Sequence, residues 1–214
     1  MSKLITPSLF GSIGWYNKAP ESWKEKAYRD LYNTLARKYK PPVGAAKRGM
    51  DFEDHLYRIL KKKKDIDKVK CSDRFKEILN HCKGGQFQVK SKSFIDIDDV
   101  EYCLYGKIDV LFPTKIIDIK TTGKWDQHSE EKYLGSMQHI MYLYNENMEI
   151  FQYIIAVFNG NVSTEIKEVK ILNYAEKFRE KLKNRIVVEI RKQNRFFKEH
   201  PALLDLYNNK YSLY

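Results

Sequence analysis

The chain has 214 residues, 43% of them hydrophobic and 14% aromatic, which excludes a disordered protein and is enough for one sizeable domain. Its formal net charge of +11 at pH 7 favours a polyanionic partner, nucleic acid first, with a merely basic soluble surface as the alternative. No apolar run approaches the ~18 residues of a membrane-spanning helix, no signal peptide is evident, and the cysteines have no CxxC spacing: Cys71, Cys82 and Cys103. We therefore expect a cytoplasmic protein without a disulfide framework.

The N-terminal part predicts one helix after an irregular start. Residues 1–19, which contain Gly11 and Gly14, are expected to be irregular. Pro20 begins a helix that ends before Pro41, because proline suits the first turn of a helix and stops a helix that precedes it. The buried stripe of this helix is predicted at intervals of four residues: Trp23, Ala27, Leu31 and Leu35.

A second helix is predicted over residues 48–64, and it carries one acid at the edge of its buried face. Glu53 lies one residue round from Phe52, so its carboxylate can either reach into a cleft or simply be solvated. The run 61–64 is all lysine and closes the helix, since cations suit the C-terminal end of the helix dipole. The predicted buried residues are Phe52, Leu56, Ile59 and Leu60.

Residues 72–99 predict a short helix followed by an edge strand. Ser72 is a favourable N-cap for a helix over 73–82. Residues 86–98 alternate between apolar and polar side chains, as in a half-exposed strand. The cluster of Asp96, Asp98 and Asp99 is typical of a turn.

The central stretch, residues 102–122, predicts two apolar strands joined by a short Pro-Thr turn. The first strand carries Asp109, and the second carries Asp118 and Lys120 on one face, because strand side chains repeat every second residue. A hairpin can bring Asp109 beside Asp118. Two carboxylates and an amine at one place suit Mg²⁺ and a phosphate, whereas the alternative is a cross-strand ion pair on a solvated face.

The residues that follow Lys120 have side chains that can contact nucleic acid. Hydroxyls, an amine and an indole can bind phosphate or stack on a base, and an ordinary loop is the alternative interpretation. These candidate nucleic-acid-binding residues are Thr121, Thr122, Lys124 and Trp125.

The C-terminal half predicts a helix over 130–147, a hairpin turned at Asn159-Gly160, a helix over 174–200 capped by Asn173, and a short last helix after Pro201. In the first of these helices, Gln138 and Tyr142 are four residues apart and share one flank. In the long helix, the predicted buried residues are Phe178, Leu182, Ile186 and Ile190.

The order of these elements predicts an α/β fold with a central mixed β-sheet flanked by helices. We expect one domain over residues 1–214, with its core at about 45–172, an N-terminal helix and a C-terminal helical extension.

Four elements in this order resemble the PD-(D/E)XK nuclease superfamily, in the group of lambda exonuclease and the RecB nuclease domain. Asp109 in GKIDVL matches the signature acid, although Ile replaces the preceding Pro. Asp118-Ile119-Lys120 matches the (D/E)-x-K element. The remaining two matches are a glycine followed four residues later by an acid, and a Gln-x-x-x-Tyr motif: Gly49 with Glu53, and Gln138 with Tyr142.

The resemblance implies a restriction-endonuclease-like core and a role for each matching residue. Glu53, Asp109 and Asp118 would bind the catalytic metal with the carbonyl of Ile119. Lys120 would position or activate the attacking water. Gln138 and Tyr142 would support Lys120 and the scissile phosphate. The cofactor would be Mg²⁺, with Mn²⁺ as a substitute, and the spacing of the three cysteines does not fit the iron–sulfur cluster of some related nucleases.

The leading hypothesis is a Mg²⁺-dependent DNA exonuclease of the phage recombination type, acting on double-stranded ends. Such enzymes pass the remaining strand to a single-strand annealing protein, and some form homo-oligomeric rings. The alternatives are a restriction or structure-specific endonuclease on the same core and a noncatalytic nucleic-acid-binding protein. The last of these predicts an incomplete acid set, whereas Glu53, Asp109, Asp118 and Lys120 are all present.

Overall fold

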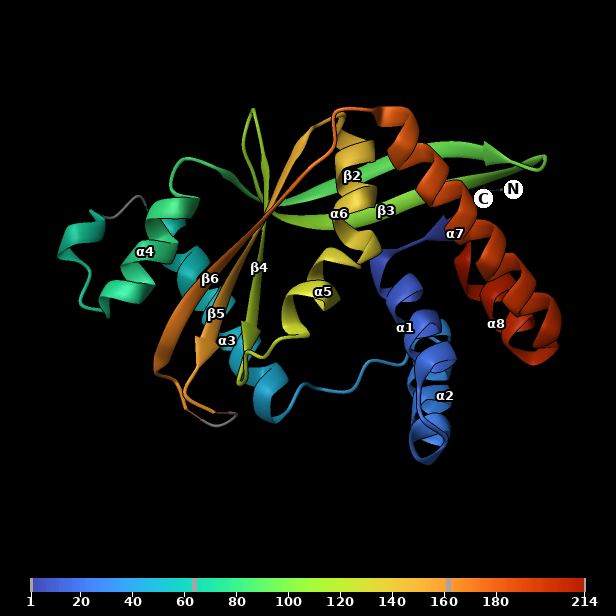
Figure 1. Ribbon diagram of the computed structural model, residues 1–214, viewed down its shortest axis with the longest axis horizontal. Coiled ribbons are helices and arrows are strands. Elements are labelled where there is room, and N and C mark those ends of the chain that lie inside the picture. The colour runs from blue at the N-terminus through green and yellow to red at the C-terminus, as the bar shows by residue number, and fades with distance from the viewer. Residues whose placement is uncertain (1, 63–64, 161–162, 214) are drawn as a thin grey trace.

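The computed structural model describes residues 2–62, 65–160 and 163–213, and it is a mixed α/β structure (Figure 1). The strands are β1 (Ser2–Ile5), β2 (Gln86–Ile97), β3 (Val100–Leu111), β4 (Ile116–Thr122), β5 (Ile150–Phe158), β6 (Ile166–Ala175) and β7 (Ser212–Leu213). The helices are α1 (Pro7–Lys18), α2 (Glu21–Leu35), α3 (Gly44–Lys61), α4 (Asp73–Cys82), α5 (Ser129–Leu134), α6 (Met137–Glu146), α7 (Arg179–Glu199) and α8 (Pro201–Tyr211), with a 3₁₀ turn at Ile66–Lys68. The predicted mixed sheet flanked by helices is confirmed.

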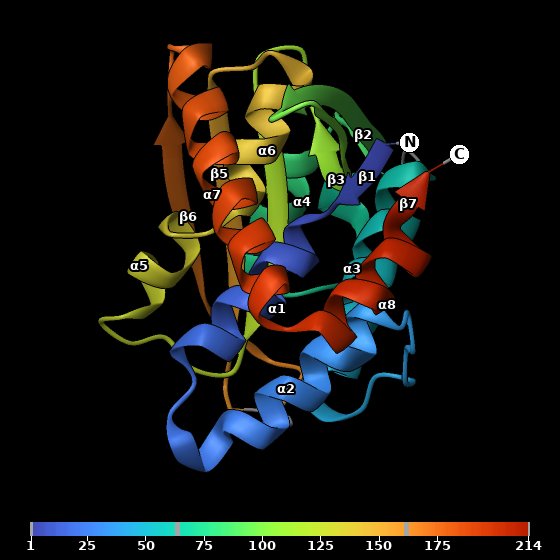
Figure 2. The same ribbon diagram turned by 90° about the vertical axis from the view of Figure 1, so that its right-hand side faces the viewer.

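One seven-stranded sheet forms the centre of the molecule, in the order β6-β5-β4-β3-β1-β7, with β2 paired to β3. β4 and β5 run parallel, which requires the crossover through α5 and α6. β1 is parallel to β3 and antiparallel to β7, so the two ends of the chain lie side by side (Figure 2). The sheet therefore includes residues at both ends of the chain, outside the segment 45–172.

Strand β3 has an edge that is only partly covered by other strands. β2 pairs with one edge of β3 along almost its whole length. The opposite edge is shared, because β1 pairs with residues 102–104 and β4 pairs only with Val110 and Leu111. Residues 105–109 lie between these two partners. A stretch of unpaired strand edge is thus left in the middle of the sheet, and its backbone groups need other partners.

Two hydrophobic clusters cover the two faces of the sheet. α1, α2, α6, α7 and α8 pack on one face and α3 with α4 on the other, which gives three layers (Figures 1 and 2). In β4, Ile116 belongs to the first cluster, whereas Ile117 and Ile119 belong to the second. The alternation predicted for this strand is therefore confirmed, and Asp118 and Lys120 are on the side of α6.

Strand β3 changes face at Asp109. Residues two apart in a regular strand share one face, yet Ile108 packs in the cluster of α6 and Val110 in that of α3. Opposite Asp109 in the register, Gln88 of β2 has a φ of 57°, a value that is uncommon for a residue other than glycine. This local distortion lies beside the unpaired edge.

Several predicted elements are confirmed. α4, α8 and the strand over residues 86–98 lie where the sequence predicts them, and Ser72 caps α4 by accepting from the amide of Phe75 at 3.3 Å. The two earlier helices are also present but have other bounds: α2 ends at Leu35 instead of just before Pro41, and α3 begins at Gly44 and ends at Lys61. Residues 63–64 of the predicted second helix lie outside the described part of the chain. The apolar stripe of α3 is buried at Phe52, Leu56 and Ile59, whereas Leu60, also predicted as buried, is half-buried.

The N-terminal prediction is wrong, since residues 2–18 form β1 and α1 rather than an irregular segment. Thr6 caps α1 by accepting from the amide of Leu9, and Pro7 occupies the first turn. Gly11 and Gly14 lie inside the helix, where no atom lies within 4 Å of the position of an added Cβ.

Three predictions in the C-terminal half are corrected in detail. The helix over 130–147 is two helices, because Ser136 has an extended conformation and caps α6. The hairpin loop runs from 159 to 165 rather than through two residues, and residues 161–162 lie outside the described part. Asn173 belongs to β6, so α7 begins later than expected.

Trp23 and Phe178, both predicted as buried, are exposed. No helix among the described residues is long and apolar enough to cross a membrane.

Candidate active site

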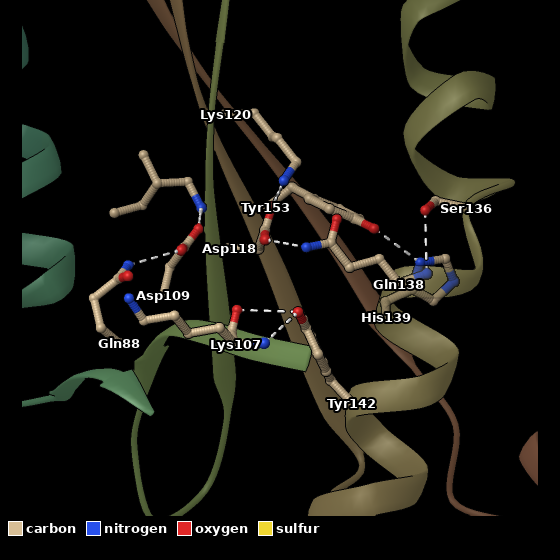
Figure 3. A network of polar contacts seen from close by, with 11 residues as sticks. Gln88, Lys107, Asp109, Asp118, Lys120, Ser136, Gln138, His139, Tyr142 and Tyr153 are labelled. Atoms are coloured by element: carbon tan, nitrogen blue, oxygen red, sulfur yellow. Dashed lines mark hydrogen bonds and ion pairs between the residues drawn. The ribbon is translucent and has the colours of Figure 1, made fainter. Parts of the chain in front are cut away.

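Asp109 takes the place of a strand partner where β3 and β4 separate. Its Oδ2 accepts a hydrogen bond from the backbone amide of Ile119 at 2.9 Å. Its Oδ1 accepts from the side-chain amide of Gln88 at 3.2 Å (Figure 3). The carboxylate therefore accepts a backbone hydrogen bond from β4 and a side-chain hydrogen bond from β2, and these two contacts fix its position.

Asp118 lies at the centre of a polar cluster on the α6 side of the sheet. It is only 2% exposed, and its Oδ1 accepts from the side-chain amide of Gln138 at 2.6 Å. Its Oδ2 lies 2.6 Å from Nζ of Lys120 (Figure 3). The hairpin thus brings Asp109 and Asp118 into one cluster, and the helix α6 contributes Gln138 to it.

Tyr142 supplies the missing partners of the open edge of β3. Its hydroxyl donates to the carbonyl oxygen of Lys107 at 3.0 Å and accepts from the amide of Lys107 at 3.1 Å. The ring can approach this closely because Gly106 has no side chain: an added Cβ would lie 2.6 Å from the hydroxyl oxygen. Gln138 and Tyr142 therefore act together, one on a carboxylate and one on the strand beside it.

Helix α3 brings Glu53 toward the same cluster from the other side of the sheet. Gly49 lets the helix pack closely on β4, since an added Cβ there would lie 2.7 Å from Oγ1 of Thr121. Burial, together with the charges of Asp109 and Asp118, raises the pKa of Glu53 to about 7 in spite of Lys120. The glycine and the glutamate four residues apart are thus explained by packing and by charge.

The charged groups of the cluster alter one another's pKa values. Burial raises the pKa of Asp118; Lys120 opposes that effect and Asp109 adds to it. Burial alone would lower the pKa of Lys120, but the charges of Asp118, Asp109 and Glu53 outweigh it and hold the pKa above its ordinary value. Lys120 is therefore an ammonium cation, and three acids depend on it for compensation.

The donor set fits a divalent cation in its chemistry. Oδ2 of Asp118 is buried and accepts no well-aligned hydrogen bond. Its nearest charged neighbour is the ammonium group of Lys120. Two acids with raised pKa values in one cluster have too little positive charge around them. In the present arrangement, however, no three His, Cys, Asp or Glu side chains of the described residues are grouped closely enough to hold a metal.

The predicted nucleic-acid-binding residues lie at the end of β4, and part of their polar capacity is used within the chain. The hydroxyl of Thr122 donates to the carbonyl oxygen of Lys124 at 2.8 Å. Trp125 stacks on Tyr133, with ring centroids 6.0 Å apart. Thr121 faces Gly49. Lys124 alone is largely exposed, with Nζ 3.4 Å from Asp126.

Three residues of the cluster were not predicted from the sequence: Gln88, Gly106 and Lys107. Gln88 holds Asp109, and the side chain of Lys107 points toward both of them (Figure 3). A polar residue in an edge strand and a glycine in a central strand are weak signals, although a glycine inside a strand does mark a close approach of another group.

Comparison with known proteins supports the fold. The sequence matches no protein-family model and no curated protein. The crystal structure of SSO0001 is similar, with a TM-score of 0.55 and 13% identity, covering 92% of this chain and 77% of that chain.

Two solved exonucleases are more loosely similar. A phage-related exonuclease from Haemophilus somnus 129PT has a TM-score of 0.49 and 10% identity, over 98% of this chain and 95% of that chain. LHK-Exo in complex with dAMP has a TM-score of 0.40 and 13% identity, over 94% of both chains. At these identities the likeness concerns the fold alone, so the function is argued from the site.

Proposed function

We propose that this protein is a divalent-metal-dependent deoxyribonuclease that hydrolyses phosphodiester bonds from DNA ends. The observation that carries this proposal is the convergence of Asp109, Asp118, Lys120 and Gln138 at the unpaired edge of β3. A solvated ion pair would not need a buried carboxylate or an amide from a crossover helix. The basic net charge of +11 is consistent with a polyanionic substrate.

The acids would hold the metal and the lysine would act beside it. Asp109, Asp118 and Glu53 would ligate Mg²⁺ or Mn²⁺, together with the carbonyl of Ile119. The bound ion would polarise a phosphoryl oxygen and lower the pKa of a water molecule. Lys120, held as a cation by the acids, would orient the attacking water and stabilise negative charge on the phosphate.

The other residues of the cluster would position these groups. Gln138 holds Asp118, and Tyr142 holds the backbone at Lys107, so both act on the strands that carry the acids. Thr121, Thr122, Lys124 and Trp125 would contact the substrate at the end of β4. One domain over residues 1–214 would carry this activity, and its single-stranded product would pass to an annealing protein.

Incubation with two duplexes tests the activity and its type. We expect loss of end label from a linear duplex in Mg²⁺ and no nicking of a covalently closed circle. Nicking of the circle would mean an endonuclease instead. No cleavage of either duplex in Mg²⁺ or Mn²⁺, with DNA still bound, would favour a noncatalytic binding protein.

A further inference from the structure

A cavity of about 700 Å³ lies between α3, α4 and the loop that joins β5 to β6. Its lining includes three buried rings of one hydrophobic cluster: Phe52, Phe75 and Phe158. The described residues that line it include none of the acids of the candidate active site. Its volume lies within the range of about 300–1,000 Å³ that is usual for small-ligand pockets. The cavity is therefore a candidate ligand site separate from the acid cluster.

The three phenylalanine rings and His55 form an aromatic wall in this cavity. The ring of Phe52 meets those of Phe75 and Phe158 edge to face, with centroids 5.4 Å and 5.6 Å apart. His55 is exposed, and its ring centroid lies 5.3 Å from that of Phe75. Aromatic side chains attract a further ring in stacked or edge-to-face contact. The wall therefore favours a ligand that contains an aromatic ring.

Arg48 brings a buried positive charge to the same cavity. It is 9% exposed, and its guanidinium lies 4.4 Å from the ring centroid of Phe158. Its Nη1 donates to the carbonyl oxygen of Gly160 at 2.8 Å, whereas Nε is buried without a hydrogen-bond partner among the described residues. Asp51, on the next turn of α3, pairs with Lys47 at 2.8 Å instead. A buried cation costs free energy unless it is paired, so the cavity favours an anion.

The other charges of the lining lie at its exposed rim. The side chains of Lys47 and Asp51 are 61% and 62% exposed and offset each other. Glu165 is exposed as well. Water screens charges at such exposure, whereas a buried charge acts in a less polar medium. The charge deepest in the cavity is therefore the positive charge of Arg48.

We propose that this cavity binds a mononucleotide, whose base contacts the aromatic wall and whose phosphate pairs with Arg48. A guanidinium binds phosphate through charge-assisted hydrogen bonds. The aromatic wall and the buried cation by themselves favour an aromatic anion. The choice of a nucleotide rests on the proposed nuclease function, because mononucleotides are what an exonuclease releases from DNA.

Calorimetric titration of the full chain in EDTA tests the ligand. We expect thymidine monophosphate (dTMP) to bind at least about tenfold more tightly than thymidine, which lacks the phosphate that pairs with Arg48. Inorganic phosphate, which lacks the ring, should also bind at least about tenfold more weakly than dTMP. Arg48→Met should remove the preference for dTMP over thymidine. His55→Ala should weaken the binding of dTMP about threefold, since one ring of the wall is lost.

Arg74 and His128 offer matched controls. Arg74 also donates to a backbone carbonyl, that of Ile166 at 2.8 Å, and it is not among the described residues that line the cavity. His128 is exposed and lies in another part of the chain. Arg74→Met and His128→Ala should each leave the Kd for dTMP within about twofold, because distant sites act independently. Circular dichroism verifies the fold of each variant.

Cys71 reports whether the ligand occupies this cavity. It is half-buried in the lining, whereas Cys82 and Cys103 are buried. Iodoacetamide should therefore modify Cys71 first, and Cys71→Ser should remove this fast phase. Saturating dTMP should slow the modification at least about fivefold, since an occupied cavity excludes the reagent. Mass spectrometry measures the rate at each cysteine.

The outcomes separate this site from the nuclease. Equal binding of dTMP and thymidine, equal effects of Arg48→Met and Arg74→Met, or an unchanged rate at Cys71 would overturn the site. If Arg48→Met does not fold, His55→Ala and the protection of Cys71 decide the question. Arg48-dependent binding of dTMP by a protein that cleaves no DNA in Mg²⁺ or Mn²⁺ would uphold the site and overturn the nuclease. Cleavage without protection of Cys71 would do the reverse.

Discussion

At the scale of single residues, the site is an excess of acid around one lysine. Asp118 is almost fully buried and Lys120 is its close counter-charge. Glu53 and Asp118 both have raised pKa values, so part of their charge is suppressed in the metal-free protein. A divalent cation would reduce the repulsion among the carboxylates of Glu53, Asp109 and Asp118. Metal binding would therefore release protons.

Replacing Lys120 should separate catalysis from binding. We expect Lys120→Ala to lower the cleavage rate at least about 100-fold and to leave the Kd for DNA within about threefold. It should also destabilise the metal-free protein by about 1–3 kcal/mol, because the buried Asp118 loses its counter-charge and Lys120 is partly exposed. Gel cleavage assays, anisotropy and urea unfolding measure the three quantities.

Lys170 offers a matched control for Lys120. It belongs to another acid-x-Lys triplet, pairs with Glu168, and its side chain is 32% exposed, the same fraction as that of Lys120. Its acid partner is 45% exposed, so Lys170→Ala should leave stability nearly unchanged. Substantial cleavage by Lys120→Ala would remove this lysine from the mechanism.

The raised pKa of Glu53 predicts how stability depends on pH. An acid whose pKa is about 7 in the folded protein and 4.5 ordinarily binds more protons when folded between these values. The free energy of unfolding, without divalent cations, should therefore fall as pH rises from 4.5 to 7 and change little above. After allowance for solvent screening the fall due to Glu53 is about 1 kcal/mol.

Glu53→Gln isolates this effect in urea unfolding measured across the pH range. The slope should become smaller but not vanish, because Asp118 contributes in the same direction. Asp51→Asn is the control on the same helix, since Asp51 is an exposed partner of Lys47, and it should keep the slope. Parallel curves for Glu53→Gln and the unmodified protein would show that Glu53 is an ordinary solvated acid.

At the scale of elements, the contacts between neighbouring strands and helices determine the positions of the side chains in the site. The sequence predicts the strands that carry Asp109 and Asp118 through alternation, and the helix that carries Gln138 through its apolar stripe. It does not predict that β4 pairs with only two residues of β3, because that depends on the twist of the whole sheet. Nor does it predict that the extended residue Ser136 separates α5 from α6. Because α6 begins directly after Ser136, Gln138 lies in its first turn and contacts Asp118.

Gly106→Ala tests the contact between β3 and α6. An added methyl group would collide with Tyr142, so α6 must move and Gln138 should lose its hold on Asp118. We expect a loss of about 1–3 kcal/mol of stability and a strong loss of cleavage. Thermal unfolding and the end-label assay measure these effects.

Gly11→Ala is the matched control for this substitution. Gly11 lies inside α1 with no atom within 4 Å of an added Cβ, so alanine should stabilise the helix by about 0.5–1 kcal/mol. Cleavage should be retained. If Gly106→Ala behaved like Gly11→Ala, Tyr142 would not depend on a close approach to β3.

At the scale of the whole molecule, the positive charge should govern association with DNA. The net charge is +11, and exposed cations such as Arg37 and Lys107 lie beside the site. We expect Kd for DNA to rise steeply with salt, because bound phosphates release counterions. A plot of log Kd against log salt concentration should have a positive slope of about 2 or more. A flat plot would contradict phosphate contacts.

The sequence by itself determined the alternation of β4, the helical stripe of α3, and the presence of three acids, a lysine, Gln138 and Tyr142 in a recognisable order. These depend on local periodicity, which a chain carries whatever its fold. Only the tertiary structure decided that β1 and β7 join the sheet, that Gln88, Gly106 and Lys107 belong to the site, and that Arg48 lines an aromatic cavity. These depend on contacts between residues far apart in the chain, and no local pattern records such contacts.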